Sequence, residues 1–346
     1  MSKKIVIRTP NHLGDCVLAL PMINETREAY PGATLSLLVP EKLSELYENN
    51  KAIDSLIKFP GQYAHGLAGV FKLREFIKDK EFDIGYVLPP SFSSASVFKL
   101  SGVKERIGYI ADGRRLLLTK PLPLPTPINS CHRSELYFNL LKRSADVELE
   151  FHKPKLFLSD DDIADGQKVL NDFGINAGEE FVAIAFRAVG ESRRWGAENY
   201  TELTKRLISE SDIKVVLIGR GEDRIEGDKI SAGAGSTKVS NLAGKTGVRE
   251  LASIISQAFA FIGNDSGAAH LAAAVGTQIV VLSGADDPKE TSPLSSRKKL
   301  IYLSNLECIS CLKNKCELKG DLFMQCMKGI TVDMVIQRFL ELRSVN

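Results

Sequence analysis

The chain has 346 residues, enough for two domains of ordinary size. Its apolar content of 44% and charged content of 25% are typical of a soluble globular protein. A formal net charge of +2 is too small for a nucleic-acid-binding surface, so no nucleic-acid partner is expected. The sequence has neither a bilayer-spanning apolar run nor the apolar core of a secretory signal, so we expect a cytoplasmic protein.

The first half alternates short apolar runs with segments of helical spacing. Strands are expected at KIVIR, TLSLLV and DIGYVL, and helices at 15–30, from 41 onward, at 66–80 and at 133–145. Apolar runs separated by helices predict parallel strands that are buried on both faces. The proline-rich stretch KPLPLPTP is expected to be an extended loop.

A second extended stretch, LEFHKPKLFLSDDD, is the expected linker, after which the alternation restarts. Strands are expected at FVAIAF, KVVLIG, AFAFIG and QIVVLSG, with a short one at Lys238. This pattern predicts an α/β protein with two doubly wound domains, residues 1–155 and 156–346, that face each other across a cleft. A cysteine-rich loop at 304–329 and an amphipathic helix at 331–343 end the chain.

The stretch FIGNDSGAAHLAAAVGT could hold a diphosphate. A strand ends at Gly263, and Asp265 or Ser266 can cap the helix of small residues that follows. The small residues from Gly267 leave the first-turn N–H groups accessible to an anion, and His270 lies near enough to reach it. An ordinary capped strand–helix junction is the alternative for these residues.

Two further loops are expected at the same edge of the same sheet. RAVGESRRWGAENY carries Arg187, Arg193 and Arg194, whose forked donors fit phosphate oxygens. GRGEDR presents Glu222 and Asp223, and an acidic residue in this position could bind ribose hydroxyls, as it does in dinucleotide folds. A solvated basic loop and a helix N-cap are the alternatives, but the convergence of three loops favours a nucleotide diphosphate site in the second domain.

Four of the six cysteines lie close together, with the spacing Cys-x2-Cys-x4-Cys-x9-Cys. They are Cys308, Cys311, Cys316 and Cys326. The first pair has the spacing of zinc ligands, so a structural zinc site could staple the loop. Free thiols or an oxidised pair are the alternatives.

Six collinear stretches resemble the ADP-heptose:lipopolysaccharide heptosyltransferases, which are inverting glycosyltransferases of family 9 with the GT-B fold. They are PNHLGDCVLALP, LPPSFSSASVFKLSGVKERIGY, HRSELYFNLL, SRRWGAENY, NLAGKTGVRELASII and FIGNDSGAAHLAAAVGT. The resemblance implies transfer of heptose from ADP-heptose to the inner core of lipopolysaccharide by an enzyme that contacts the inner membrane peripherally.

The resemblance also implies roles for single residues. Asp15 matches the catalytic base and Arg193 the cation on the donor phosphates. Donor-binding positions match Glu222, Asp265, Ser266, Gly267 and His270. On the acceptor side, Gly14, Ser91 and Ser94 are expected to bind the sugar, although Pro90 stands where the family motif has asparagine.

These roles define a reaction that has no need of a metal cofactor. Asp15, a carboxylate near a helix N-terminus, stays ionised and is a weak base. A weak base suffices when the transition state resembles an oxocarbenium ion, because the attacking hydroxyl becomes acidic only as its bond to carbon forms. Arg193 and the helix that begins near Ser266 would stabilise the departing ADP.

Basic residues of the first domain could face the anionic acceptor and the membrane; they are Lys104, Arg106, Arg114, Arg115 and Arg133. A solvated surface is the alternative. Two rival functions also remain open at this point. One is a GT-B enzyme with another nucleotide sugar or glycan acceptor, and the other is a non-catalytic nucleotide- or metal-binding relative.

Overall fold

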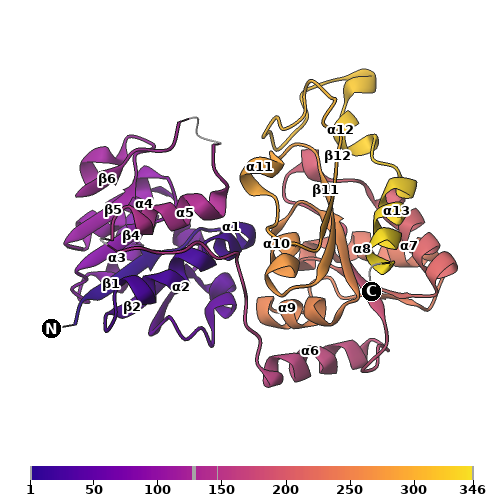
Figure 1. Ribbon diagram of the computed structural model, residues 1–346, viewed down its shortest axis with the longest axis horizontal. Coiled ribbons are helices and arrows are strands. Elements are labelled where there is room, and N and C mark those ends of the chain that lie inside the picture. Colours follow the sequence, from indigo (N-terminus) through magenta and orange to yellow (C-terminus); the bar gives the residue numbers. More distant parts are fainter. Residues whose placement is uncertain (1, 127–129, 146, 345–346) are drawn as a thin grey trace. The chain divides into compact units, whose positions relative to one another are not determined.

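The computed structural model describes residues 2–126, 130–145 and 147–344. They form two compact units, Met1–Pro154 and Lys155–Asn346 (Figure 1). Each unit has one parallel sheet of six strands with helices on both of its faces.

The first unit follows a strand–helix alternation. Its strands are β1 (Lys4–Arg8), β2 (Thr34–Pro40), β3 (Ser55–Phe59), β4 (Ile84–Val87), β5 (Glu105–Tyr109) and β6 (Lys120–Leu122). Its α-helices are α1 (Leu13–Leu18), α2 (Leu20–Ala29), α3 (Gly66–Ile77), α4 (Phe92–Leu100) and α5 (Arg133–Lys142). The sheet order β3-β2-β1-β4-β5-β6 is that of a dinucleotide-binding fold, so the strand order reverses between β1 and β4.

The second unit repeats this topology. Its strands are β7 (Phe181–Ala185), β8 (Lys214–Ile218), β9 (Val239–Asn241), β10 (Ala260–Asn264), β11 (Gln278–Ser283) and β12 (Lys298–Tyr302). The order β12-β11-β10-β7-β8-β9 places the reversal between β7 and β10.

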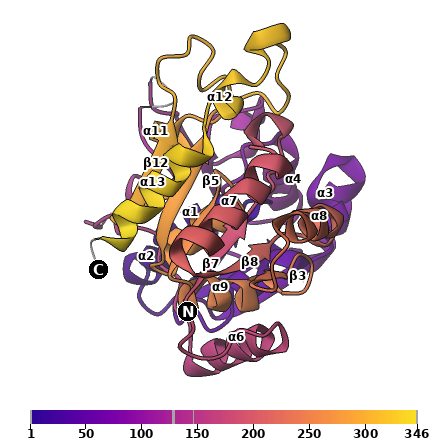
Figure 2. The ribbon, with the colours of Figure 1, turned by 90° about the vertical axis from the view of Figure 1, so that its right-hand side faces the viewer.

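The helices of the second unit cover both faces of its sheet. They are α6 (Asp160–Asp172), α7 (Ala197–Ser211), α8 (Arg224–Ala234), α9 (Val248–Gln257), α10 (Gly267–Ala274), α11 (Pro288–Thr291), α12 (Gln325–Lys328) and α13 (Val332–Arg343). Helix α13 packs beside α7 (Figure 2). Phe339 on the inner face of α13 is fully buried. The predicted final helix is therefore part of the core of this unit.

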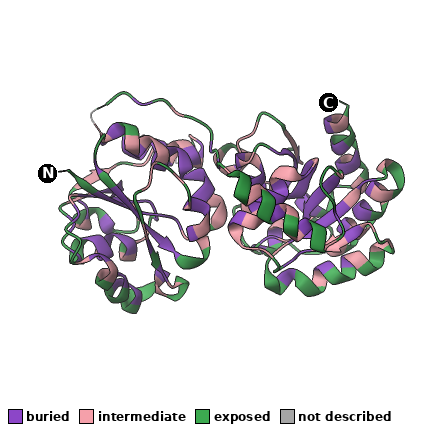
Figure 3. Ribbon diagram, turned by 90° about the horizontal axis from the view of Figure 1, so that it is seen from below, coloured by how far each residue is buried: buried purple, intermediate pink, exposed green. Residues whose placement is uncertain are grey.

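Burial explains why the apolar runs form strands. Ile5, Val6 and Ile7 of β1 are fully buried, and so is every apolar residue of β10 from Ala260 to Ile262. Strands covered on both faces read as continuous apolar runs rather than alternating ones. Figure 3 shows the buried strands inside each unit and the exposed outer faces of the helices.

Three local expectations were wrong. The helix expected at 15–30 is interrupted at Ala19, between α1 and α2. The segment from Glu41 forms a 3₁₀ helix to Tyr47 rather than an α-helix. The start of the proline-rich stretch pairs with β5 as β6, an edge strand where Pro121 is tolerated; Pro127, at its end, lies outside the described residues.

Candidate functional site

Predicted site residues lie at both points where the strand order reverses. Ligands of open parallel sheets bind beyond the carboxyl ends of the strands at such points. In the first unit, β1 leads to Asp15 and β4 leads to Ser91. In the second unit, β7 leads to Arg193 and β10 leads to Asp265. Each unit therefore has one candidate site built from two loops.

The turn after β10 contains the predicted diphosphate site. Ser266 lies at the N-cap of α10 with its hydroxyl not engaged in a capping hydrogen bond. Asp265 and His270 are both buried, and Nε2 of His270 lies 3.8 Å from Oδ1 of Asp265. The structure thus brings Asp265, Ser266, Gly267 and His270 together, with His270 directed at the buried carboxyl group.

Burial and, after it, the negative charge of Asp286 raise the pKa of Asp265 to about 7. A hydrogen bond from Ser283 and the positive charges of Lys298 and Arg193 oppose these effects. The Asp265 carboxyl group therefore holds a proton much more readily than an exposed aspartate does. When it is protonated, this carboxyl group can donate a hydrogen bond to an anionic oxygen. When it is ionised, it can accept a hydrogen bond from an N–H or O–H group.

The loop after β7 places Arg193 at the same edge of the sheet. Nε of Arg193 forms an ion pair with Oδ2 of Asp286 at 2.5 Å, and Nη1 donates to Oδ1 of Asn314 at 3.1 Å. Trp195 anchors the loop because its Nε1 donates to the carbonyl of Ile330 and its backbone N–H donates to Oδ1 of Asn264. The Asn264 bond joins this loop to the end of β10.

The other arginines of the loop have structural partners. Arg187 pairs with Asp223 and Glu226, and Arg194 donates to the carbonyls of Ala188 and Val189. Of the three arginines, Arg193 is the one whose charge acts on Asp265, and its ion-pair partner Asp286 acts on Asp265 as well.

Glu222, the predicted ribose ligand, lies in a 3₁₀ turn at 221–223 after β8. Its carboxylate pairs with Arg220 at 2.6 Å and is well exposed. The buried acidic residue of this loop is Asp223, which accepts from the backbone N–H of Arg220. The Glu222 carboxylate is therefore exposed to solvent, whereas Asp223 stabilises the conformation of the loop through its hydrogen bond with Arg220.

Asp15 lies in the first turn of α1, two residues after its first residue. The N-cap position belongs to His12, so Asp15 is not the cap residue. The Asp15 side chain is 30% exposed, and Nη1 of Arg133 lies 4.0 Å from its Oδ1. The adjacent Cys16 is fully buried and burial raises the pKa of its thiol to about 12, so Cys16 is not a nucleophile.

The serines of the acceptor-side motif begin α4. Ser91 is the N-cap, its hydroxyl accepts from the backbone N–H of Ser94, and the two hydroxyl oxygens lie 2.8 Å apart. Ser94 is buried, so of the two serines Ser91 is the more accessible. Gly14 lies in the first turn of α1, at the end of the neighbouring strand β1.

One of the basic residues expected on the surface is instead internal. Arg114 is 1% exposed and its guanidinium donates to the carbonyls of Tyr109 and Pro89. Burial lowers its pKa to about 10. Arg114 therefore holds the backbone before Ser91 and cannot face a membrane.

The four clustered cysteines have free thiols, with Cys326 buried and Cys311 exposed. Burial, with the nearby thiols of Cys308, Cys311 and Cys316, raises the pKa of Cys326. Across residues 2–126, 130–145 and 147–344, no group of three or more His, Cys, Asp or Glu side chains is arranged to hold a metal ion. The side chains of this structure therefore do not fit a preformed zinc centre.

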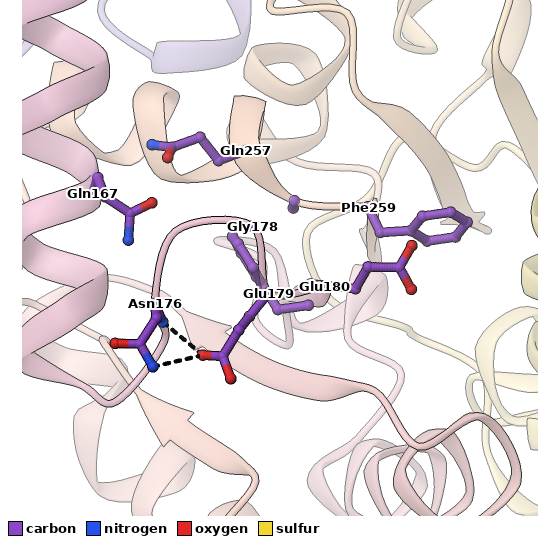
Figure 4. Close-up of a pocket in the computed structure, with 9 residues that line it drawn as sticks. Gln167, Asn176, Gly178, Glu179, Glu180, Gln257 and Phe259 are labelled. Atoms are coloured by element: carbon purple, nitrogen blue, oxygen red, sulfur yellow. Dashed lines mark hydrogen bonds between the residues drawn. The ribbon is translucent and has the colours of Figure 1, made fainter.

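A pocket of about 200 Å³ lies away from these loops (Figure 4). Its lining includes Gln167, Asn176, Glu179, Gln257 and Phe259. The side-chain amide of Asn176 donates a hydrogen bond to the Glu179 carboxylate. Its residues precede β7 and β10, at the amino ends of these strands. The pocket is thus at the opposite edge of the sheet from the predicted diphosphate site.

Sequence reasoning missed three polar residues of the second unit: Asn264, Asp286 and Asn314. Asn264 is completely buried at the end of β10 and binds the Arg193 loop. Asp286 follows β11, a strand whose carboxyl end reaches the same edge, so the strand order could have indicated it. Nothing in the sequence near Asn314 indicates its contact with Arg193, because the two residues are 121 positions apart.

Two doubly wound α/β units, each with loops converging at its point of strand reversal, match the GT-B fold of solved heptosyltransferase structures. Residues 70–321 match the family model described as glycosyltransferase family 9 (heptosyltransferase). The chain belongs to this family and is a glycosyltransferase.

Comparisons with individual relatives agree with this family assignment. The chain is 28% identical over 312 residues to lipopolysaccharide heptosyltransferase 2 of Escherichia coli, covering 87% of this chain and 88% of that protein. The solved structure of E. coli ADP-heptose lps heptosyltransferase II superposes with a TM-score of 0.80 at 26% identity, over 98% of both chains. A family 9 glycosyl transferase from Veillonella parvula has a TM-score of 0.86 at 20% identity over 100% and 99% of the chains, which is a likeness of fold. The predicted family and α/β fold class are confirmed.

Proposed function

We propose that this enzyme transfers heptose from ADP-heptose to the inner core of lipopolysaccharide, with inversion at the anomeric carbon. The observation that carries the proposal is that Arg193 and the Asp265–His270 turn lie at the strand reversal of the second unit, where Asp286 pairs with Arg193 and acts electrostatically on Asp265. The E. coli relative, whose name specifies ADP-heptose, has the same fold over nearly its whole length.

The second unit would bind the donor. The N–H groups at the start of α10 and the guanidinium of Arg193 supply positive charge for a diphosphate. The buried Asp265 carboxyl group, with its pKa near 7, could share a proton with a phosphate oxygen. Glu222 is exposed at the neighbouring strand end, in a position suited to ribose hydroxyls.

Loss of ADP is the step that this charge would assist. As the glycosidic bond breaks, negative charge grows on the terminal phosphate oxygen. Arg193 is oriented before the reaction by its two partners, so its reorganisation during bond cleavage costs little. The positive end of α10 adds a fixed dipole to the same oxygen.

The first unit would bind the acceptor and supply the base. Asp15 is partly exposed and has a cationic neighbour in Arg133, which favours the ionised carboxylate. An acceptor hydroxyl at Asp15 would lose its proton to the carboxylate as it attacks the anomeric carbon from the face opposite ADP. Gly14 in the first turn of α1 and the accessible Ser91 at the start of α4 would border the acceptor.

A membrane-anchored acceptor would require contact with the inner membrane from the cytoplasmic side. Among the described residues no helix has the length and apolarity to cross a bilayer. Exposed cations of the first unit, Lys104 and Arg115, would serve a peripheral contact with anionic headgroups. We therefore propose peripheral attachment through the first unit.

A structural zinc ion at the four cysteines stays a prediction from sequence. Its ground is the cysteine spacing alone, because the described side chains do not form a preformed metal centre. Metal analysis after purification under reducing conditions tests it. Less than about half an equivalent of zinc would count against the site.

The proposed donor is tested first by calorimetric titration of the full chain with ADP, UDP and GDP, without added metal. Selective binding of ADP is expected, and Arg193→Ala should weaken it. Preference for UDP or GDP would keep the glycosyltransferase and discard the ADP-activated donor. Unchanged ADP binding in Arg193→Ala would remove Arg193 from the donor site.

A further inference from the structure

The cysteine-rich segment touches the predicted donor site through one side chain. Asn314 lies between Cys311 and Cys316, and its Oδ1 accepts a hydrogen bond from Nη1 of Arg193 at 3.1 Å. The segment leaves the sheet after β12 and returns at α12 (Figure 1). A loop that is remote in sequence thus reaches the arginine proposed to bind the diphosphate.

The segment also holds the backbone on which Arg193 lies. The carbonyl of Asn314 accepts from the backbone N–H of Ser192 at 3.1 Å, and the carbonyl of Lys313 accepts from the Ser192 hydroxyl. A Cβ at Gly190 would lie 2.9 Å from Nη1 of Arg193 and 3.0 Å from Oδ1 of Asn314. Glycine at position 190 therefore leaves the space in which the two side chains meet.

The segment is itself fixed to the sheet. The backbone N–H groups of Ser310 and Leu312 donate to the carbonyls of Gly284 and Ala285, just after β11. The Ser310 hydroxyl bonds to the Asp286 carbonyl at 3.0 Å and lies 2.7 Å from the Tyr302 hydroxyl. Ser310 and Leu312 adopt the left-handed backbone region, with φ of 56° and 58°, an uncommon conformation kept by these bonds.

We propose that Asn314 is a positioning residue for donor binding, which orients the Arg193 guanidinium toward the diphosphate. The inference rests on the proposed role of Arg193. Two contacts on different nitrogens, to Asp286 and to Asn314, fix the guanidinium plane. Because Asn314 is neutral, it orients the cation without cancelling its charge, whereas Asp286 does both.

A double-mutant cycle on the full chain tests this role. Asn314→Ala should weaken ADP binding about tenfold and raise the donor KM more than it lowers kcat, since one hydrogen bond to a charged group is lost. The same change in an Arg193→Lys background should have little further effect, because lysine has no Nη1 to orient. Asn305→Ala, at another exposed asparagine that precedes the first clustered cysteine, is the matched control.

The outcomes of these titrations separate the positioning role of Asn314 from the proposed role of Arg193. Wild-type ADP affinity in Asn314→Ala would overturn the positioning role, and so would equal losses in the wild-type and Arg193→Lys backgrounds. Normal ADP binding in Arg193→Ala would instead reject the proposed role of Arg193, and with it the positioning role. If Asn314→Ala melts early, Asn314→Asp keeps the shape; its added negative charge should weaken ADP binding at low salt, and unchanged affinity would overturn the proposal.

Discussion

Nε of Arg193 lies 2.5 Å from Oδ2 of Asp286, and both side chains are largely buried at the carboxyl edge of the second sheet. The pair joins the loop after β7 to the loop after β11 across the point of strand reversal. The Asp286 charge is also a cause of the raised pKa of Asp265. The Asp286 carboxylate thus orients the Arg193 guanidinium and also raises the pKa of the Asp265 carboxyl group in the predicted donor site.

Asp286→Asn should therefore tighten ADP binding. The amide keeps an oxygen close to Nε of Arg193 but removes a negative charge beside the proposed diphosphate. A gain of about three- to tenfold in affinity is expected at low salt, and less at high salt because of screening. Calorimetric titration at two salt concentrations measures it. Asp287→Asn, at the carboxylate that caps α11, is the control, and weaker ADP binding in Asp286→Asn would refute the argument.

Asp15→Asn should remove turnover while sparing donor binding. The amide has nearly the same shape but cannot take a proton, so kcat should fall at least about 100-fold. ADP affinity should stay within about twofold, because Asp15 belongs to the first unit and the proposed donor site to the second. Asp79→Asn, an exposed carboxylate of the first unit, is the matched control. Turnover near the wild-type rate in Asp15→Asn would exclude Asp15 as the base.

The raised pKa of Asp265 predicts a pH dependence of stability. With a folded-state pKa of about 7 and an ordinary value of 3.8, the folded protein retains between these values a proton that the unfolded chain releases. The free energy of unfolding should then decrease as pH rises from about 4 to 7, by at most about 1.4 kcal/mol per pH unit from this group.

Urea denaturation at several pH values tests this dependence in wild type and Asp265→Asn. The variant should lack the contribution of Asp265 and have a flatter profile. The imidazole of His270 lies 3.8 Å from Asp265, so both chains should also be compared in a His270→Gln background, which removes it. Identical slopes in the two chains would mean that Asp265 is not protonated on folding.

The sequence predicted most of the sheets because buried parallel strands give continuous apolar runs. β1 and β10 are of this kind. No expectation included β3, β5 or β12. β3 and β12 are edge strands of mixed polarity, and β5 begins with the charged residues Glu105 and Arg106. Edge strands bury fewer side chains, so their pattern is weaker.

The candidate site was predictable where it lies next to a strand end. Asp15, Arg193 and the Asp265 turn all follow buried strands closely, and in the folded chain the charges of Arg193 and its partner Asp286 both act on Asp265. Arg114 looked like a surface cation, but its carbonyl partners become visible only in the folded chain. Asn314 depends on a contact across 121 residues, which local patterns cannot indicate.

The ion pair between Arg249 and Asp162 should stabilise the second unit. Nε and Nη2 of Arg249 donate to the two oxygens of Asp162 at 2.5 and 2.7 Å, joining α9 to the first turn of α6. Arg249 also donates to the carbonyl of Phe157 in the chain before α6. Both side chains are close to nine-tenths buried, so the pair is little screened by solvent.

Hydrogen bonding from Arg249 lowers the pKa of Asp162 to about 2 from its ordinary value of 3.8. A depressed folded-state pKa contributes stability above about pH 4, which is lost as the pH falls toward 2. Asp162→Asn should reduce the free energy of unfolding at pH 7 by about 2–4 kcal/mol, because it also leaves Arg249 buried without its carboxylate. The loss should shrink below pH 4, where Asp162 of the wild type is itself being protonated.

Urea titration at pH 7 and pH 3 measures both effects, with Asp161→Asn as the control. Asp161 is the neighbouring exposed carboxylate in the first turn of α6, so it shares the helix position and lacks the burial. Its substitution should change stability by less than about 0.5 kcal/mol. Equal effects of the two substitutions at pH 7 would show that helix-terminal charge, rather than the pair with Arg249, accounts for the stabilisation.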